Sequence, residues 1–239
     1  MTNLKVHLLK DRKIMSEVVL VVVAHSDDES ISMAGTISKH VKKGDKVFVV
    51  SMTKGVGARD DANLNEINER KNASILASQV LEFEWGDCYE FNDNAMDSYP
   101  LIQVVKAVEK AKQKYSPTLV YTHSGADLNV DHRVVANAVL TAFRPQPNEQ
   151  CKEIRLFEVA SATDYGNSAI TGSFSPNLFV DISKEWLTKV GALEAYNAEM
   201  RDYYHSRSIE GIKNLAKLRG NQVGYDFAEA FEVIRKLED

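Results

Sequence analysis

The stretch from Val18 to Ser30 reads VVLVVVAHSDDES and decides the fold of this chain. Its first part, up to Ala24, is continuously apolar and rich in β-branched side chains, which predicts a strand buried on both faces. A histidine, two adjacent aspartates and a glutamate follow at once, and apolar residues then recur at helical spacing. The stretch is therefore a strand, an acidic turn and a helix. Acidic residues suit a helix N-terminus, but the same turn is also a candidate half of an active site.

Strand-like and helix-like segments alternate through most of the sequence. Strands are predicted at 18–24, 46–52, 80–85 and 118–122, and two further strands, whose direction stays open, at 153–159 and 178–182. Helices are predicted at 31–41, 66–79, 101–115 and 134–142, and the region from Trp186 onward is expected to be mainly helical. This alternation predicts an α/β fold with a mostly parallel central sheet covered by helices on both faces. No linker or internal repeat divides the chain, so residues 1–239 are expected to form a single domain, with 1–17 as an N-terminal extension.

The composition is that of an ordinary soluble globular protein. Apolar residues make up 44% and charged residues 26%, and the net charge of -5 argues against nucleic acid or an anionic membrane surface as a partner. No apolar run reaches the roughly 18 residues that a membrane span needs. The first residues lack the apolar core of a signal peptide, so we expect a cytoplasmic protein. Cys88 and Cys151 form neither a disulfide framework nor a CxxC pair, so any metal site must use His, Asp and Glu.

Side chains of the metal-ligand type follow two of the predicted strands. Ligands of parallel α/β sheets bind outside the carboxyl ends of the strands, so chemistry is expected just after residues 24, 52, 85 and 122. His25 and Asp28 follow the first strand three residues apart, and His132 opens the helix that follows the fourth. Two imidazoles and one carboxylate leave a position for water, which is typical of catalytic zinc, although other divalent ions also accept such ligands. Asp27 is the neighbouring candidate for moving a proton, and Asp127 and Asp131 are candidates for orienting an imidazole.

A structural interpretation of both segments stays open at this point. Ser26, Asp27, Asp28 and Glu29 are good residues for a helix cap and a first helical turn, and Asp131 suits the start of the next helix. Either segment alone would more often be a cap than a site, because motif matches are only hypotheses. The two together, each after a buried strand, favour an active site.

The two segments also resemble the signatures of a known family. AHSDDES resembles the AHPDDE motif of the PIG-L (LmbE-like) family of zinc-dependent de-N-acetylases, and THSGADLNVDHRVVANAV, at 122–139, is similar to that family's second signature. Softer matches are SPNLFVDIS at 175–183, with Lys189 after it, and AEAF at 228–231. The resemblance covers roughly residues 18–231, which would be the family core. It implies a Rossmann-like three-layer α/β sandwich.

The resemblance also implies roles for individual residues. The implied metal ligands, for Zn²⁺ or another divalent ion, are His25, Asp28 and His132. Asp27 would be the general base that activates the metal-bound water and then the acid for the leaving amine. The family has a histidine, oriented by the aspartate at Asp131, that helps to stabilise the oxyanion, and this chain has Asn129 there. An amide donates a hydrogen bond to an oxyanion but carries no charge.

Further residues are weaker candidates for substrate binding. The residues proposed for this role are Arg59, Asp87, His123, His205 and Arg207. The alternative for His123 is a hydrogen-bonded structural histidine, and the alternative for the segment around His205 is a surface or oligomer-interface segment. Glu69 and Arg70 are expected to form an ordinary surface pair. AEAF near the end is expected to pack a helix, with Glu229 as a residue that approaches the site.

The resemblance and the ligand pattern together predict a metal-dependent hydrolase. It would remove the acetyl group from an N-acetylated amino sugar or sugar conjugate, which would be its small-molecule partner, and a homo-oligomer is a further expectation from the family. Two alternatives stay open. The substrate is another amide, such as a thiol-linked glucosaminide or an acylated antibiotic, or Asn129 marks a lapsed enzyme that binds sugars without hydrolysing them.

Overall fold

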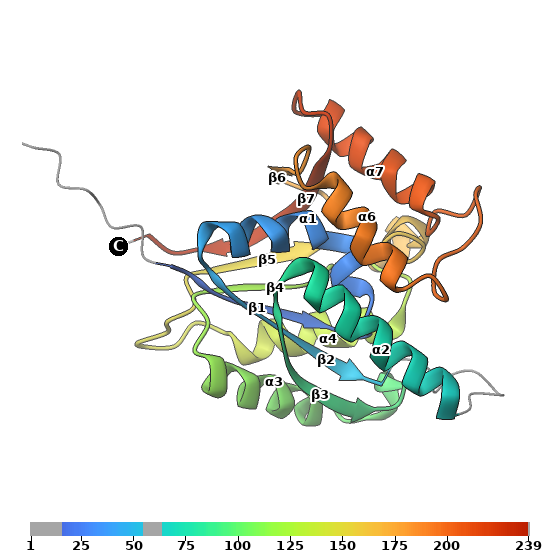
Figure 1. Ribbon diagram of the computed structural model, residues 1–239. Helices are drawn as coiled ribbons and strands as arrows, with labels where there is room; N and C mark the ends of the chain where they lie inside the picture. The colour runs from blue at the N-terminus through green and yellow to red at the C-terminus, as the bar shows by residue number, and fades with distance from the viewer. Residues whose placement is uncertain (1–15, 55–63, 239) are drawn as a thin grey trace, which may run out of the picture.

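The computed structural model describes residues 16–54 and 64–238, which form one seven-stranded sheet with helices on both faces (Figure 1). The strands are β1 (Val18–Val23), β2 (Lys46–Thr53), β3 (Glu84–Phe91), β4 (Leu119–His123), β5 (Glu153–Phe157), β6 (Leu178–Asp181) and β7 (Ala228–Lys236). The helices are α1 (Asp28–Lys43), α2 (Leu64–Leu81), α3 (Leu101–Tyr115), α4 (Val130–Ala142), α5 (Ser168–Thr171), α6 (Trp186–Ala195) and α7 (Ile209–Asn221). Helices α1, α2, α6 and α7 lie on one side of the sheet, and α3 and α4 on the other. The prediction of a Rossmann-like α/β sandwich is confirmed.

The strand order brings the ends of two predicted strands together. Along the sheet the order is β3-β2-β1-β4-β5-β7-β6, and the first five of these strands are parallel to one another. The direction of winding reverses between β1 and β4. Strands β2 and β3 lie on one side of β1, whereas β4 and β5 lie on its other side. Such a switch point opens a crevice at the carboxyl ends of the two central strands. The segments after β1 and β4 therefore face each other.

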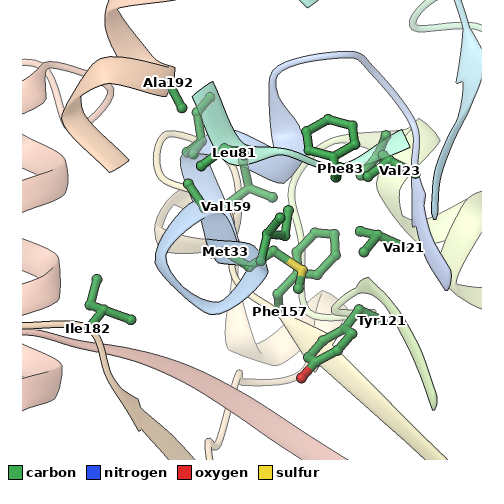
Figure 2. Packing of buried hydrophobic residues seen from close by; sticks show 14 of the residues in the cluster. Val21, Val23, Met33, Leu81, Phe83, Tyr121, Phe157, Val159, Ile182 and Ala192 are labelled. Atoms are coloured by element: carbon green, nitrogen blue, oxygen red, sulfur yellow. The ribbon is translucent and has the colours of Figure 1, made fainter. Parts of the chain in front are cut away.

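Two core clusters cover the two faces of the sheet. Along β1 the side chains alternate: Val19, Val21 and Val23 pack under α1 and α6, whereas Leu20 and Val22 pack against α3 and α4. All five are fully buried, which explains why this strand has no polar residue. Figure 2 shows the first cluster, where Met33 of α1 lies near Phe157 and Tyr121 of the sheet. The strand ends thus rest on rigid, well-packed elements.

The third and last strands differ from the sequence prediction. The strand expected at 80–85 is wrong in position, because α2 continues to Leu81 and β3 runs from Glu84 to Phe91. This edge strand is half-exposed and polar, so its apolar pattern is weak. The C-terminal segment is also not helical: AEAF belongs to β7, the strand antiparallel to β5 and β6. Its alanines and glutamates favour a helix locally, and pairing between two strands overrides that preference.

Some expectations concern residues outside the described part of the chain. Residues 1–15 of the expected N-terminal extension and Arg59 fall there. Within the described ranges, no helix combines the length and the apolar character that crossing a membrane requires.

Candidate active site

Three predicted metal ligands converge at the switch point between β1 and β4. Nδ1 of His25 lies 3.3 Å from Nε2 of His132 and 3.3 Å from Oδ2 of Asp28. Nε2 of His132 lies 3.5 Å from Oδ1 of Asp28. All three side chains are buried, and His25 and Asp28 also line an open cleft. The structure thus brings together the three residues that the sequence placed after two different strands.

The spacing and charge of this cluster fit a metal ion. A tetrahedral ion bound at about 2.0–2.1 Å holds its ligand atoms roughly 3.3–3.4 Å apart, close to the distances found here. Burial opposes protonation of His132, but the carboxylates of Asp28 and Asp127 outweigh it and raise the pKa of His132 to about 9. Burial also lowers the pKa of His25, yet carboxylate hydrogen bonds, led by Asp131, raise it well above its ordinary value. The cluster therefore favours a positive charge, and a cation between these atoms meets that requirement.

Carboxylates on the outer side of each imidazole leave the inner nitrogen available. Nδ1 of His132 lies 3.0 Å from Asp127, which also accepts a hydrogen bond of 2.8 Å from Thr163. Nε2 of His25 lies 3.2 Å from Asp131 and 3.0 Å from Asp93. Such partners fix the ring orientation and the tautomer of metal-binding histidines. Asp127 and Asp131 thus lie beside the two imidazoles, as predicted for orienting groups.

Asp27 lies beside the ligand cluster in a strained backbone conformation. It precedes α1 with a φ of 141°, a region that residues other than glycine rarely adopt and that costs about 1–3 kcal/mol. Its Oδ1 pairs with Arg70 at 3.0 Å, whereas its buried Oδ2 has no hydrogen-bond partner among residues 16–54 and 64–238 and lies 3.7 Å from Arg207. Burial raises the pKa of Asp27, and the charge of Arg70 offsets part of this rise. One carboxylate oxygen is therefore held in place, whereas the other faces Arg207 without a hydrogen bond and is available to accept a proton.

Arg70 belongs to this site, which corrects the expectation of a surface pair. Its side chain is only 7% exposed, and besides Asp27 it pairs with Glu199 at 2.8 Å. Its Nε also donates to the carbonyl oxygen of Ser26 at 2.9 Å. No local signal in the sequence indicates this burial, because the residues around Arg70 in α2 are polar and largely exposed. Its environment comes from the packing of α2 over the end of β1.

Asn129 is the N-cap of α4 and also lines the cleft. Its side-chain oxygen accepts the N–H of Asp131 at 2.8 Å, and its Nδ2 donates to Asn94 at 3.2 Å. The cap of this helix is thus Asn129 and not Asp131. The second N–H of the amide is not engaged by these contacts, so Asn129 keeps a donor in the cleft.

The remaining predicted residues have different positions. Arg207 lines the cleft and is held by a hydrogen bond of 2.8 Å from its Nε to Ser161. His205 is exposed and does not line the cleft, and its Nδ1 accepts the N–H of Arg207. His123 is fully buried under the cluster: its Nε2 accepts the N–H of Ala24 at 2.8 Å, and its ring stacks on that of His132 at 4.0 Å. It therefore supports a ligand and does not reach a substrate in the cleft.

Asp87 lies inside β3 and not after it, so the reason for selecting it was wrong. Its carboxylate pairs with Lys114 of α3 at 2.9 Å and does not line the cleft. The residue that follows the true end of β3 at the site is Asp93, beside His25. Glu229 is likewise not in the cleft, because its carboxylate accepts N–H groups of α1. Placing the end of β3 correctly would have led to Asp93.

The fold and these contacts define a class of protein: a Rossmann-like α/β protein with a His–Asp–His cluster and an adjacent aspartate at a cleft of about 330 Å³. The sequence profile of the PIG-L family, described as GlcNAc-PI de-N-acetylase, matches residues 20–143, just over half of the chain. The protein belongs to the PIG-L family.

Several solved structures share this fold. An N,N'-diacetylchitobiose deacetylase from Pyrococcus horikoshii matches with a TM-score of 0.75 and 21% identity, over 92% of this chain and 85% of that one. The A40926 pseudoaglycone deacetylase Dbv21 matches with a TM-score of 0.71 and 18% identity, over 94% and 100%. The 4-carboxy-2-hydroxymuconate hydratase GalB from Pseudomonas putida KT2440 matches with a TM-score of 0.74 and 18% identity, over 93% of this chain and 99% of that one. Because the last is a hydratase, the fold alone does not determine the reaction.

Proposed function

We propose that this protein is a metal-dependent N-deacetylase that hydrolyses the acetamide of an acetylated amino sugar or sugar conjugate. One observation carries the proposal: Asp27, whose Oδ2 has no hydrogen-bond partner in the described part of the chain, lines the cleft beside the convergent nitrogen and oxygen atoms of His25, Asp28 and His132. A proton acceptor next to a ligand set with an open face is the arrangement that metal-assisted hydrolysis requires. Membership of the PIG-L family supports the same reaction.

His25, Asp28 and His132 would hold the ion, which we propose to be zinc. When bound, such an ion acidifies water and polarises a carbonyl group. Asp27 then moves the protons: its Oδ2 accepts one from the attacking water and delivers it to the amide nitrogen as the C–N bond breaks. The products are acetate and the free amine. Arg70 holds Oδ1 during both transfers, so that Oδ2 keeps its direction.

Asn129 would donate a hydrogen bond to the carbonyl oxygen as negative charge develops on it. Its amide is fixed at both ends, by Asp131 and by Asn94, and therefore needs no reorganisation during the reaction. The amide gives less stabilisation than a charged imidazole would. We therefore assign it a supporting role beside the metal.

Replacing Asn129 with serine should lower kcat by about 10²-fold or more, because removing one oxyanion donor typically costs about 10²–10³-fold. Serine is also a good N-cap, so the melting temperature should change little. Steady-state kinetics and thermal denaturation check this result. Asn167→Ser is a matched control, since Asn167 caps the exposed helix α5 in the same way. An unchanged kcat in Asn129→Ser would remove Asn129 from the reaction.

The cleft favours a small polar substrate. Its volume is near the lower end of the roughly 300–1,000 Å³ that small-molecule sites occupy. Among the described residues its lining consists of carboxylates, amides, guanidinium groups and one imidazole, without a large apolar side chain: His25, Asp27, Asp28, Arg70, Asp93, Asn94, Asn129, Glu199, Arg201 and Arg207. Such groups match sugar hydroxyls. We propose that Arg207, which borders Asp27, contacts the sugar.

The proposed function is tested by acetate release from a panel of acetylated sugars, free, nucleotide-linked and lipid-linked, with metal content measured in parallel. We expect release from at least one sugar or conjugate, its loss after dialysis against a chelator, and its return when zinc is added. Release that persists in chelator would contradict the metal-dependent mechanism. Release only from other amides would retain the mechanism and change the substrate class.

A sugar-binding protein without catalysis is the second candidate, and Asn129 is the observation that favours it. An amide in place of the family's histidine cannot carry a proton or a charge. Bound metal and measurable sugar binding, with no acetate release from any member of the panel, would support this candidate.

A further inference from the structure

Helix α1 is broken one turn after the site. Met33 has a φ of −144° and a ψ of 23°, outside the helical region, so α1 consists of a first turn and a longer second part. The first turn begins with Asp28 and is buried all round. In the second part Ile37 is buried and the residues after His40 become exposed, as in a helix that covers one face of a sheet. The first turn builds the site, whereas the second part packs the core.

A buried ion pair occupies the break. In an unbroken helix the N–H of Gly35 would bond to the carbonyl oxygen of Ile31. Here Oε1 of Glu229 accepts the N–H of Gly35 at 3.0 Å, and Oε2 accepts that of Thr36 at 2.7 Å. Nζ of Lys189 donates to the carbonyl oxygen of Ile31 at 2.8 Å and to Oε1 of Glu229 at 2.7 Å. The pair therefore replaces the backbone hydrogen bond that the break removes.

This pair connects α1, α6 and β7, and its burial carries a large desolvation free energy. Lys189 comes from α6 and Glu229 from β7, and they are only 2% and 4% exposed. Desolvating two charges costs several kcal/mol, and apolar residues often stabilise such positions as well or better. Gly35 also lets the side chain of Ile182 pack directly on the break, because a Cβ at position 35 would lie 2.6 Å from it.

The contacts continue from the pair to the site. Lys189 donates to the carbonyl oxygen of Ile31, and the backbone N–H of Ile31 donates to the carbonyl oxygen of Asp27 at 2.9 Å. Asp28 follows Asp27 directly and starts the same turn. Neither Lys189 nor Glu229 lines the cleft, so any effect on chemistry passes through the backbone of this turn.

We propose that the Lys189–Glu229 pair is a positioning pair, which fixes the direction of the first turn of α1 and so sets Asp28 against the two histidines and Asp27 toward the cleft. The consequences for metal binding and turnover rest on the proposed function. The expected effect on the backbone of the first turn is independent of the proposed function, because the pair holds this turn whether or not an ion is bound.

The test uses Glu229→Gln and Lys189→Met in the full chain. Glutamine has the same shape but offers one acceptor oxygen, so either Gly35 or Thr36 loses its partner. We expect zinc affinity to fall about tenfold or more, the range seen when groups that orient metal ligands are removed. We also expect kcat to fall more than KM changes. The double variant should lose no more zinc affinity and kcat than the more severely affected single variant, since the two residues act as a unit.

The matched control is Glu149→Gln, which breaks a partly buried pair with Lys112 in a part of the fold that shares no cavity with the first turn of α1. It should lower the melting temperature without changing zinc affinity. Amide hydrogen exchange, measured well below the melting temperature, gives a readout independent of metal. In Glu229→Gln the amides of Ser30 and Ile31 should exchange faster, and in the control they should not.

The possible results separate the two proposals. If the wild-type protein binds no zinc, the proposed function fails, and amide exchange alone decides the role of the pair. If the wild-type protein binds zinc but Glu229→Gln leaves both zinc affinity and exchange in the first turn as they were, the positioning role is overturned. A fall in melting temperature with no change in either measurement would make the pair merely structural, which also overturns the proposal.

Discussion

Asp27→Asn should lower kcat by about 10²–10⁴-fold, the usual contribution of a positioned general base, while bound metal stays at the wild-type level. The variant removes the proton-accepting oxygen and leaves the three proposed ligands intact. Asparagine is a better test than alanine for two reasons. It tolerates the positive φ at this position better than alanine, and its amide oxygen remains a partner for Arg70. Steady-state kinetics together with elemental analysis give the result.

Asp87→Asn provides the control for this experiment, because Asp87 forms an ion pair with Lys114 away from the cleft. It should leave kcat near the wild-type value. If Asp27→Asn bound its full complement of metal and kept a kcat within about twofold of the wild-type value, another residue would have to carry the proton. A variant that lost its metal would instead mean that Asp27 supports the ligand cluster, and the base assignment would again be wrong.

The parts of the site that local patterns determine were predictable from the sequence. The apolar, β-branched run from Val18 to Ala24 predicted a buried strand, so the position of His25 at its carboxyl end followed. His132 came from the same argument at the end of β4. Their convergence needed one general rule, that parallel strands present their carboxyl ends at one edge of the sheet. The pairing of β1 with β4 places the segments after the two strands side by side, and there Nδ1 of His25 lies 3.3 Å from Nε2 of His132.

The parts that depend on packing were not predictable. Arg70 resembles any surface arginine until α2 is placed over the end of β1. Asp93 was missed because β3 is a polar edge strand whose end the apolar pattern does not mark. β7 was missed because its alanines and glutamates favour a helix, and only pairing with β5 and β6 makes the segment a strand. In each case the deciding interaction joins residues far apart in the chain.

Asp28→Asn should weaken zinc binding by more than about 100-fold, because loss of a direct ligand should exceed the roughly 10–100-fold cost of losing an orienting partner. Asparagine keeps the shape of Asp28 and an acceptor for the N–H of His25, so the turn should survive. What disappears is the negative charge between the two imidazoles. Competition with a chromophoric chelator measures the affinity, and acetate release should fall in parallel.

Asp93→Asn distinguishes the proposed cluster from a second one that shares His25. Nδ1 of His25 faces Asp28 and His132, whereas its Nε2 faces Asp93 and Asp131, and each set is close enough to hold an ion. If the ion lies on the Nδ1 side, Asp93→Asn should weaken zinc binding by less than about tenfold, since Asp131 still orients the ring at 3.2 Å. The reverse pattern, with Asp93→Asn severe and Asp28→Asn mild, would place the ion on the Nε2 side. Asp27 would then no longer lie beside the metal, and the proton route proposed for it would lose its basis.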